Sequence, residues 1–192
     1  MFEPIFKNFA RHVVLDDPEI DYVKSILRHR VVEKNEYLLR PGDVCGTMNF
    51  VLKGCLRIYY ADPEGKEHIS HFAFEDWWAV DTTSFYSQTP AVLTIDALEK
   101  TEVYQISYFD LEKLYEKVPK FERFFRILAQ NAYVLQQRRI IANLSQTAEQ
   151  RYKEFKKTYP KFHRRIAQKH IASFLGITPE FLSMLRKKKS FY

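Results

Sequence analysis

The sequence is poor in cysteine and glycine, and it has no long hydrophobic run. Only two of its 192 residues are cysteines, Cys45 and Cys55, and they lack the spacing and the additional ligands of a metal site. We therefore expect two reduced core thiols and no iron–sulfur cluster. No segment approaches the roughly 18 apolar residues of a membrane span, and the amino end lacks the basic-then-apolar order of a signal peptide. These absences predict a cytoplasmic protein without a membrane partner.

Positive charge is sparse in the first three quarters of the chain and dense in the last. The segment from Arg151 to Tyr192 holds twelve Lys or Arg residues against two acids, a net charge of +10. Because the whole chain carries +6, residues 1–150 must sum to −4. This asymmetry indicates a carboxyl-terminal part that binds a polyanion, attached to a part with a different role.

Glycine, although scarce, is concentrated in one region. Four of the five glycines lie there: Gly42, Gly46, Gly54 and Gly65. Short β-branched and aromatic runs alternate with turn residues in the same region, which predicts an antiparallel β-roll over about residues 30–108. A helix at residues 16–28, capped by Asp16 or Asp17, precedes the roll.

Helical periodicity returns after the roll and is sustained from Pro119 to about Leu144. Steps of four and three form a heptad seam, whose members are Phe121, Phe125, Leu128, Ala132 and Leu135. A second stripe consists of Ile127, Val134 and Ile141. We expect the seam from Phe125 to Leu135 to join two copies of the chain and the second stripe to pack on the roll. The alternative is a helix that covers only its own domain. The polar segment 145–150 predicts a hinge.

The stretch HIASFLGITPEFLSMLRKKK, residues 170–189, predicts two short helices joined by a tight turn. Gly176 ends the first helix, and Thr178 caps the second with Pro179 in its first turn. The inner sides are apolar and comprise Ile166, Ile171, Leu175, Leu182 and Leu185. This spacing is typical of a helix-turn-helix, although any pair of packed antiparallel helices shares it. The +10 charge of the same segment favours DNA as its partner.

Taken together, these parts resemble one known family. A β-roll with RPGDV, FVLKGCLRIYY and EGKEHI, then a strand ending EVYQIS, a long helix and a helix-turn-helix, resembles the cAMP receptor protein and FNR (Crp/Fnr) family of bacterial transcription regulators. The resemblance spans residues 15–189. It implies an α+β fold in which residues 1–118 form a cyclic-nucleotide-binding-like β-roll, a double-stranded β-helix. Residues 119–145 would then form a dimerisation helix, and residues 146–192 a DNA-binding domain.

The resemblance also implies partners and excludes catalysis. It predicts a transcription regulator rather than an enzyme, acting as a homodimer on double-stranded DNA with a near-palindromic operator. RNA polymerase and an unidentified small-molecule effector are further candidate partners.

The DNA contacts are expected on the second helix of the motif. Glu180 occupies the position of a family acid that reads cytosine. Pro179 and Met184 stand where the family usually has base-reading arginines, so we do not expect arginine to read guanine there. The predicted contacts are Thr178, Pro179, Glu180, Ser183, Arg186, Lys187, Lys188 and Lys189, with the cations on phosphates.

The roll lacks the residues that hold a cyclic phosphate in this family. At the positions of the family's Gly, Glu, Arg and Ser or Thr, this chain has Val80, Asp81, Ala91 and Val92. No Lys or Arg occurs from Glu67 to Glu99, while six acids do. A buried phosphate needs a charge-assisted partner such as arginine, so we expect the roll to reject cAMP. A distant residue such as Arg57, or helix N–H groups, would have to compensate.

The same region is rich in aromatic residues, which either fill the roll or line an effector pocket. The pocket would take a neutral or cationic apolar ligand. Its predicted lining is Trp77, Trp78, Asp81, Phe85, Ala91 and Val92.

A histidine-bearing strand, HISHFAFE, raises two other possibilities. Haem bound through His68 or His71 is disfavoured, because a lone histidine in a strand is usually structural. A cupin-like metal enzyme would need ligands on one strand face, but His68 and His71 point to opposite faces and only His71 and Glu75 could converge. A basic surface that binds RNA or membranes without sequence preference is a third alternative. We expect no catalytic residue, no metal and no other cofactor.

Overall fold

The computed structural model describes residues 2–160 and 164–188. Eight strands in this part of the chain form two four-stranded antiparallel sheets, in the orders β1-β8-β3-β6 and β2-β7-β4-β5. The predicted β-roll is therefore confirmed. Its strands are β1 (Arg28–Val32), β2 (Tyr37–Leu39), β3 (Thr47–Lys53), β4 (Leu56–Ala61), β5 (Glu67–Ala73), β6 (Trp78–Ala79), β7 (Thr94–Ala97) and β8 (Thr101–Ser107).

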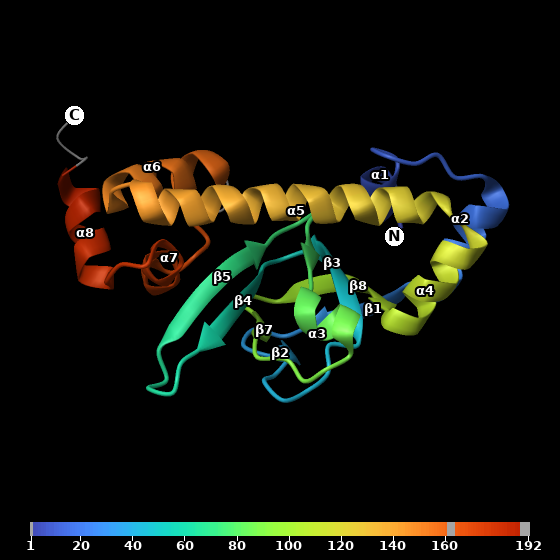
Figure 1. The fold of residues 1–192 in the computed structure, drawn as a ribbon, viewed down its shortest axis with the longest axis horizontal. Helices are drawn as coiled ribbons and strands as arrows, with labels where there is room; N and C mark the ends of the chain where they lie inside the picture. Colours follow the sequence, from blue (N-terminus) through green and yellow to red (C-terminus); the bar gives the residue numbers. More distant parts are fainter. Residues whose placement is uncertain (1, 161–163, 189–192) are drawn as a thin grey trace.

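Helices lie at both ends of the molecule, and one long helix, α5, joins them (Figure 1). The roll lies beneath α5, with α1, α2 and α4 at one end and α6 to α8 at the other. Within the described ranges, no helix is long and apolar enough to cross a membrane. The helices are α1 (Glu3–Phe9), α2 (Asp17–Ile26), α3 (Thr82–Ser87), α4 (Tyr108–Lys117), α5 (Lys120–Ser145), α6 (Ala148–Thr158), α7 (Gln168–Leu175) and α8 (Pro179–Lys188).

Local capping fixes where two of these helices begin. Asp16 and Glu19 form a capping box at α2, in which each side chain accepts a hydrogen bond from the other residue's backbone N–H at 2.9 Å. Thr147 starts α6 in the same way, since its hydroxyl accepts from the backbone N–H of Gln150. Only residues 146–147 separate α5 from α6, and this short break lies within the predicted hinge segment.

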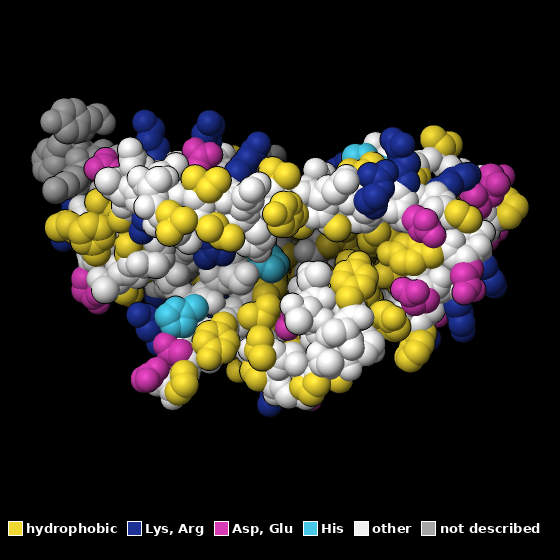
Figure 2. Space-filling view, viewed as in Figure 1, with side chains coloured by type: hydrophobic (Ala, Val, Ile, Leu, Met, Phe, Trp, Pro, Cys, Tyr) yellow, Lys and Arg dark blue, Asp and Glu magenta, His cyan; other side chains and the backbone are white. Residues whose placement is uncertain are grey.

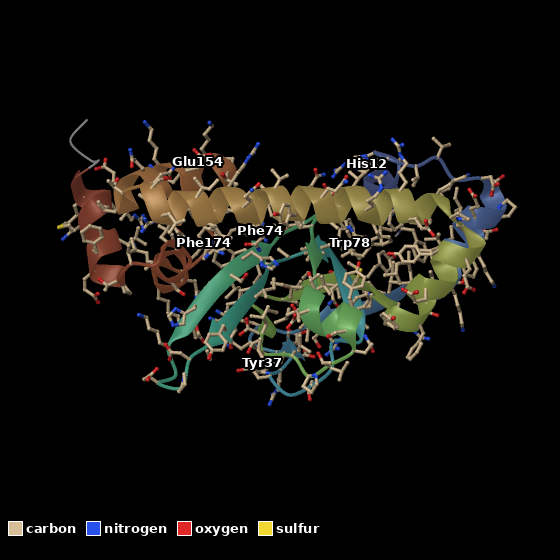
Figure 3. All side chains as sticks on the ribbon, in the orientation of Figure 1. His12, Tyr37, Phe74, Trp78, Glu154 and Phe174 are labelled. Carbon is tan, nitrogen blue, oxygen red and sulfur yellow. The ribbon has the colours of Figure 1, made fainter. Side chains whose placement is uncertain are left out.

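The core of the roll is closed by α1 and by the beginning of α5. Phe121, Phe124 and Phe125 are at most 4% exposed, and Phe9 of α1 is fully buried. Phe9 meets the rings of Phe121 and Phe124 edge to face, with ring centroids 4.9 and 5.0 Å apart. Trp78 of β6, which is labelled beneath α5 in Figure 3, packs against Phe124 and Phe125. The first turns of α5 therefore belong to the core of the roll.

A second core joins the roll to α6, α7 and α8. Phe72 in β5 and Phe74, which follows it, are fully buried, and they pack against Phe155, Tyr159 and Phe174 from the carboxyl-terminal helices. Because these helices cover the rings of β5, both sides remove apolar surface from water. The buried members are Cys55, Tyr59, Ile69, Phe72, Phe74, Tyr152, Phe155, Tyr159, Ile166, Ile171, Ala172, Leu175 and Leu182. We call this set the junction core.

The heptad seam of α5 faces the chain's own body. Phe125 is buried and Leu128 packs against the core of the roll, so the prediction that these two residues form a dimer surface is wrong. Large phenylalanine rings at the start of the seam fill the roll more completely than the second stripe could. Arg139 continues the seam by helical periodicity and donates hydrogen bonds to β5 and α7. Ala132 is exposed and Leu135 is 51% exposed, but both lie on this inward side of the helix.

The second stripe of α5 faces outward instead of packing on the roll. Val134 is 41% exposed and Ile141 56% exposed. Helical periodicity places Tyr133, Ile140 and Leu144 on the same side, and their exposed fractions are 69%, 59% and 83%. Hydrophobic side chains along α5 are visible in Figure 2. We call the row of Tyr133, Val134, Ile140, Ile141 and Leu144 the outer stripe.

Candidate nucleic-acid interface

The turn between α7 and α8 is shaped by a glycine. Gly176 has φ +65°, in the left-handed region that favours glycine. Its N–H donates to the carbonyl of Ser173, and the N–H of Ile177 donates to that of Ala172, both at 3.0 Å. This pair of bonds is a Schellman ending. The turn ends α7 at Leu175, and α8 begins at Pro179 after a short connection. The predicted helix-turn-helix is therefore confirmed.

α8 begins at the predicted cap. The hydroxyl of Thr178 accepts a hydrogen bond from the backbone N–H of Phe181 at 3.2 Å. Leu182 is fully buried and Leu185 is 7% exposed, so these residues fix the inner side of α8. The opposite side faces away from the roll at the end of the molecule (Figure 1).

Most of the predicted DNA contacts lie on the exposed part of α8. Ser183 is half-buried, and Lys188 is the last residue of α8. Lys189 lies outside the described residues. The exposed predicted contacts are Thr178, Pro179, Glu180, Arg186 and Lys187.

Two residues of this surface did not emerge from the sequence as candidate contacts. Phe181 is 40% exposed and Met184 is 42% exposed. In the sequence, Met184 was notable only because an arginine is usual at its position, and Phe181 was not considered. The exposure of both residues could have been predicted from helical spacing, because each lies one residue before a buried leucine and so points away from the inner side of the helix.

The predicted effector pocket does not form as one site. Trp78 lies in the core of the roll, where its indole N–H donates to the side chain of Asn8 at 3.2 Å. Trp77 packs instead against Phe74 and Tyr159 of the junction core. Trp77 thus contacts both cores and Trp78 only that of the roll, because adjacent residues in an extended segment point in opposite directions.

The remaining pocket candidates are also split. Phe85 and Ala91 are buried, whereas Val92 is 63% exposed. Asp81 caps α3, and one of its oxygens accepts from the backbone N–H of Ser84 at 3.2 Å. Its other carboxylate oxygen is buried and has no hydrogen-bond partner among the described residues. Asp81 is therefore a cap of α3 and supplies no cation for a phosphate.

Arg57 is engaged by acids within the chain. Its guanidinium donates to both carboxylate oxygens of Asp96, at 2.7 and 2.8 Å, and to both of Glu67. It also donates to Nδ1 of His170 in α7, at 3.2 Å. The hydrogen bonds to Asp96 and Glu67 raise the pKa of Arg57 above its usual range, against the effect of burial. The hydrogen bonds of Arg57 therefore connect the roll to α7.

The histidine strand does not assemble a metal site. His68 pairs with Asp62, and His71 contacts the hydroxyl of Ser70. Glu75 accepts from the backbone N–H of Gly54 and from Arg165. Across the described ranges, no group of three His, Cys, Asp or Glu residues is arranged to hold a metal ion.

Both cysteines are buried in the fold. Cys45 is 3% exposed and Cys55 is 2% exposed. Burial raises the pKa of each thiol, which disfavours the reactive thiolate.

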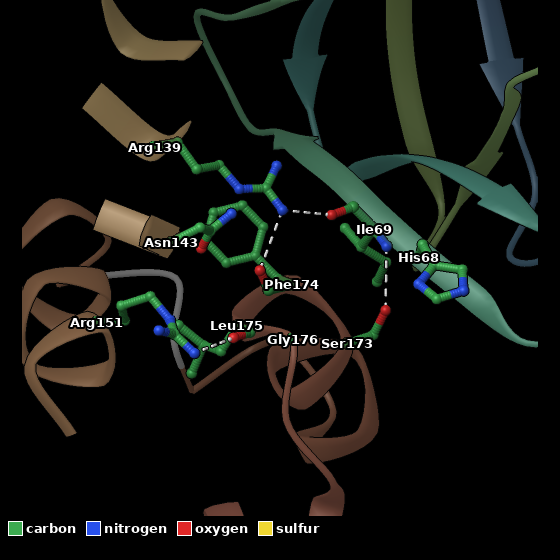
Figure 4. Close-up of a pocket in the computed structure, with 9 residues that line it drawn as sticks. All are labelled: His68, Ile69, Arg139, Asn143, Arg151, Ser173, Phe174, Leu175 and Gly176. Carbon is green, nitrogen blue, oxygen red and sulfur yellow. Dashed lines mark hydrogen bonds between the residues drawn. The ribbon is translucent and has the colours of Figure 1, made fainter. Parts of the chain in front are cut away.

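A cavity of about 330 Å³ lies where the roll, α5 and α7 meet (Figure 4). Arg139 donates to the carbonyls of Ile69, Ser70 and Phe174, and Arg151 donates to that of Leu175 at 3.1 Å. The two guanidiniums thus complement the carbonyl-rich end of α7. The lining residues are His68, Ile69, Arg139, Asn143, Arg151, Ser173, Phe174, Leu175 and Gly176.

A sensor-type roll, a long helix and a helix-turn-helix define the architecture of a DNA-binding regulator. Residues 29–118 match the family model of the cyclic nucleotide-binding domain. The solved structure of the c-di-GMP-responsive global regulator CLP of Xanthomonas campestris shares the fold, with a TM-score of 0.74 at 16% identity, over 91% of this chain and 92% of that one. The structure of FixK2 from Bradyrhizobium japonicum has a TM-score of 0.70 to this chain at 18% identity, over 85% of this chain and 84% of that one.

The curated relatives are regulators rather than enzymes. The anaerobic regulatory protein of Pasteurella multocida is 24% identical over 89% of this chain. The transcriptional activator protein anr of Pseudomonas aeruginosa is 25% identical over 86% of it. The chain spans 66% and 72% of the length of these relatives, respectively. Residues 29–118 thus contain a cyclic nucleotide-binding domain, and the chain as a whole is similar in sequence and fold to transcription regulators of the Crp/Fnr family.

Proposed function

We propose that this protein regulates transcription as a homodimer that binds a near-palindromic operator through α8. The observation that carries the proposal is the exposed side of α8, which bears Glu180, Arg186 and Lys187 on a helix-turn-helix scaffold. The +10 charge of the segment from Arg151 to Tyr192 supports phosphate neutralisation along the same surface.

The outer stripe of α5 is the proposed dimer surface. Five large apolar side chains on one side of α5, each 41–83% exposed, are unusual on a surface that faces only water. Two such helices packed side by side would bury both rows and would place two copies of α8 on one duplex. The proposed surface therefore shares Val134 and Ile141 with the stripe that the sequence assigned to the roll, and it contains no residue of the heptad seam.

The roll is proposed not to depend on cAMP. Arg57 is occupied by Asp96 and Glu67, and Asp81 brings a negative charge to the capping position of α3. Neither supplies the cation that a buried phosphate requires. RNA polymerase and a small-molecule effector of other chemistry remain predictions. Titration calorimetry with cAMP should show no binding, and micromolar affinity would contradict this part of the proposal.

The function is tested by selection of binding sites from a random duplex pool with the purified full chain. The expected result is an enriched inverted repeat, whose half-site centres are about one helical turn apart. Affinity should fall steeply with salt and should be at least about a thousandfold weaker for unrelated duplexes. Equal affinity for every duplex and for RNA would instead indicate a non-specific basic surface.

A further inference from the structure

The outermost row of α8 has an unusual mixture of side chains. At 100° per residue, Glu180, Ser183, Met184 and Lys187 lie opposite the buried Leu182 and Leu185. Met184 is 42% exposed in the centre of this row, and Phe181 is 40% exposed beside it. The exposed side of the reading helix is therefore apolar at its centre, while Arg186 and Lys187 lie further along it.

Met184 and Phe181 keep a large exposed area on α8. Leu182 and Leu185 are 0% and 7% exposed and form its buried side, whereas Met184 and Phe181 are 42% and 40% exposed. The cations of this segment attract negatively charged groups, and the apolar side chains between them can contact an apolar group. The expected partner therefore has an apolar group flanked by negative charges. The major groove offers one such group, since the 5-methyl of thymine lies between two phosphate backbones and is the only methyl on the edges of the four bases.

We propose that Met184 and Phe181 read thymine 5-methyl groups in each half-site. This inference rests on the proposed function, because it assumes that α8 enters the major groove. A methionine side chain is flexible and polarizable, so it can follow a methyl group closely. It has no N–H to donate to the acceptors of guanine. Glu180 lies on the same side of α8 as Met184. Its carboxylate can only accept hydrogen bonds, so it requires a base with an amino donor.

The test removes the methyl groups and leaves the base pairing unchanged. A selected operator is synthesised with deoxyuridine in place of thymidine at one position at a time, and the affinity of the full chain is measured at constant salt. At one or two positions per half-site the affinity should fall by about fourfold, the value expected for one buried methyl. At the other positions it should be unchanged.

Variants assign the lost contact to its residue. Met184→Ala and Phe181→Ala should weaken binding to the thymine operator and should bind thymine and uracil operators equally at the affected position. Met184→Arg should shift a repeated selection from thymine towards guanine there, because arginine pairs with the acceptors of guanine. Arg186→Ala is the matched control, since it should weaken both operators equally and reduce the salt dependence by about one ion. Thermal melting of each variant confirms that α8 is folded.

The outcomes separate the two proposals. If a specific operator is selected but uracil replaces thymine without loss at every position, the methyl reading is overturned and the proposed function stands. If Met184→Ala keeps the full sensitivity to uracil, the assignment to Met184 is wrong. If the selection yields no specific duplex, the proposed function itself fails.

Discussion

At the scale of single residues, His170 marks the contact between α7 and the roll. Arg57 donates to its Nδ1, and because a guanidinium has no acceptor, His170 must be neutral in this arrangement. Burial is the main cause that lowers the pKa of His170 to about 4, and Arg57 and Lys169 add to it against the opposite effect of Glu67 and Asp96. This contact is therefore sensitive to acid.

The low pKa of His170 predicts a loss of stability on acidification. Below pH 6.5 the unfolded chain binds a proton that the folded chain does not bind, so the free energy of unfolding falls as the pH drops from 6.5 towards 4. The loss is at most roughly 3 kcal/mol. Urea unfolding at pH 7.5 and 5.0 measures it. His170→Gln, which retains an acceptor for Arg57, should lose less stability over this interval, and an equal loss in both proteins would contradict the assignment.

Gly54 is a second position where one residue controls the fold. Its φ is +104°, and a Cβ there would lie 2.7 Å from Cα of Thr101 and 2.8 Å from the carbonyl oxygen of Lys100. We expect Gly54→Ala to lower the free energy of unfolding by about 3 kcal/mol or more, since strain and a backbone clash combine. Gly42→Ala is the matched control. Gly42 also has a positive φ but has open space around it, so its loss should be only about 1–2 kcal/mol.

At the scale of elements, substitutions on the exposed side of α5 test the proposed dimer surface. Ile141→Glu together with Leu144→Glu should raise the dimer dissociation constant at least roughly 100-fold, because each places a charge in an apolar interface. Sedimentation equilibrium measures the constant. Leu135→Glu changes an exposed leucine of the same helix on the inward side and should alter it by no more than about twofold. Dissociation by Leu135→Glu alone would restore the heptad seam as the interface.

The sequence predicts those elements whose signals are local. The helix cap at Asp16, the glycine turn at Gly176 and the cap at Thr178 each act within a few residues, and all three appear in the structure. The side of α5 that faces the roll was not predictable in this way. Two apolar stripes of similar length compete for it, and the aromatic rings of Phe9 and Trp78, distant in the sequence, favour the side with Phe121 and Phe125.

The same distinction between local and long-range signals applies to the candidate site residues. The predicted contacts on α8 depend on helical spacing, and five of them are exposed: Thr178, Pro179, Glu180, Arg186 and Lys187. The effector pocket depended on how Trp77, Trp78 and Asp81 converge across the roll, which spacing does not specify. The role of Arg57 was also hidden, because its partners Glu67 and Asp96 come from neighbouring strands and His170 comes from another domain.

At the scale of the whole molecule, α7 is bound directly to the roll. The hydroxyl of Ser173 donates to the carbonyl of Glu67 and accepts from the N–H of Ile69, at 2.6 and 3.0 Å. Arg165 joins Glu75 and Glu99 across the same boundary. Arg139 of α5 binds both sides through backbone carbonyls. In this arrangement the roll and α5 together hold the orientation of the DNA-binding helices.

Arg139→Met should loosen that attachment. The variant keeps an unbranched apolar stem but loses the guanidinium and its hydrogen bonds to three carbonyls. Hydrogen exchange at the amide of Ile69, which donates to Ser173, should become faster by about tenfold or more. Arg138→Met changes the exposed neighbour and should leave the exchange rate unchanged. Unaltered exchange in Arg139→Met would show that the junction core holds α7 without this arginine.

The junction core also limits modularity. Its aromatic side chains come from β4, β5 and the residues after β5 on one side and from α6 and α7 on the other. Neither side therefore has a complete core without the other. A chimera that transplants the DNA-binding helices onto another sensor would leave Tyr152 and Phe155 without their counterparts, and the truncated roll would present Phe72 and Phe74 to solvent. To reuse this DNA-binding specificity in another protein, one should graft the exposed residues of α8 onto a different helix-turn-helix scaffold. The whole carboxyl-terminal domain should not be transplanted.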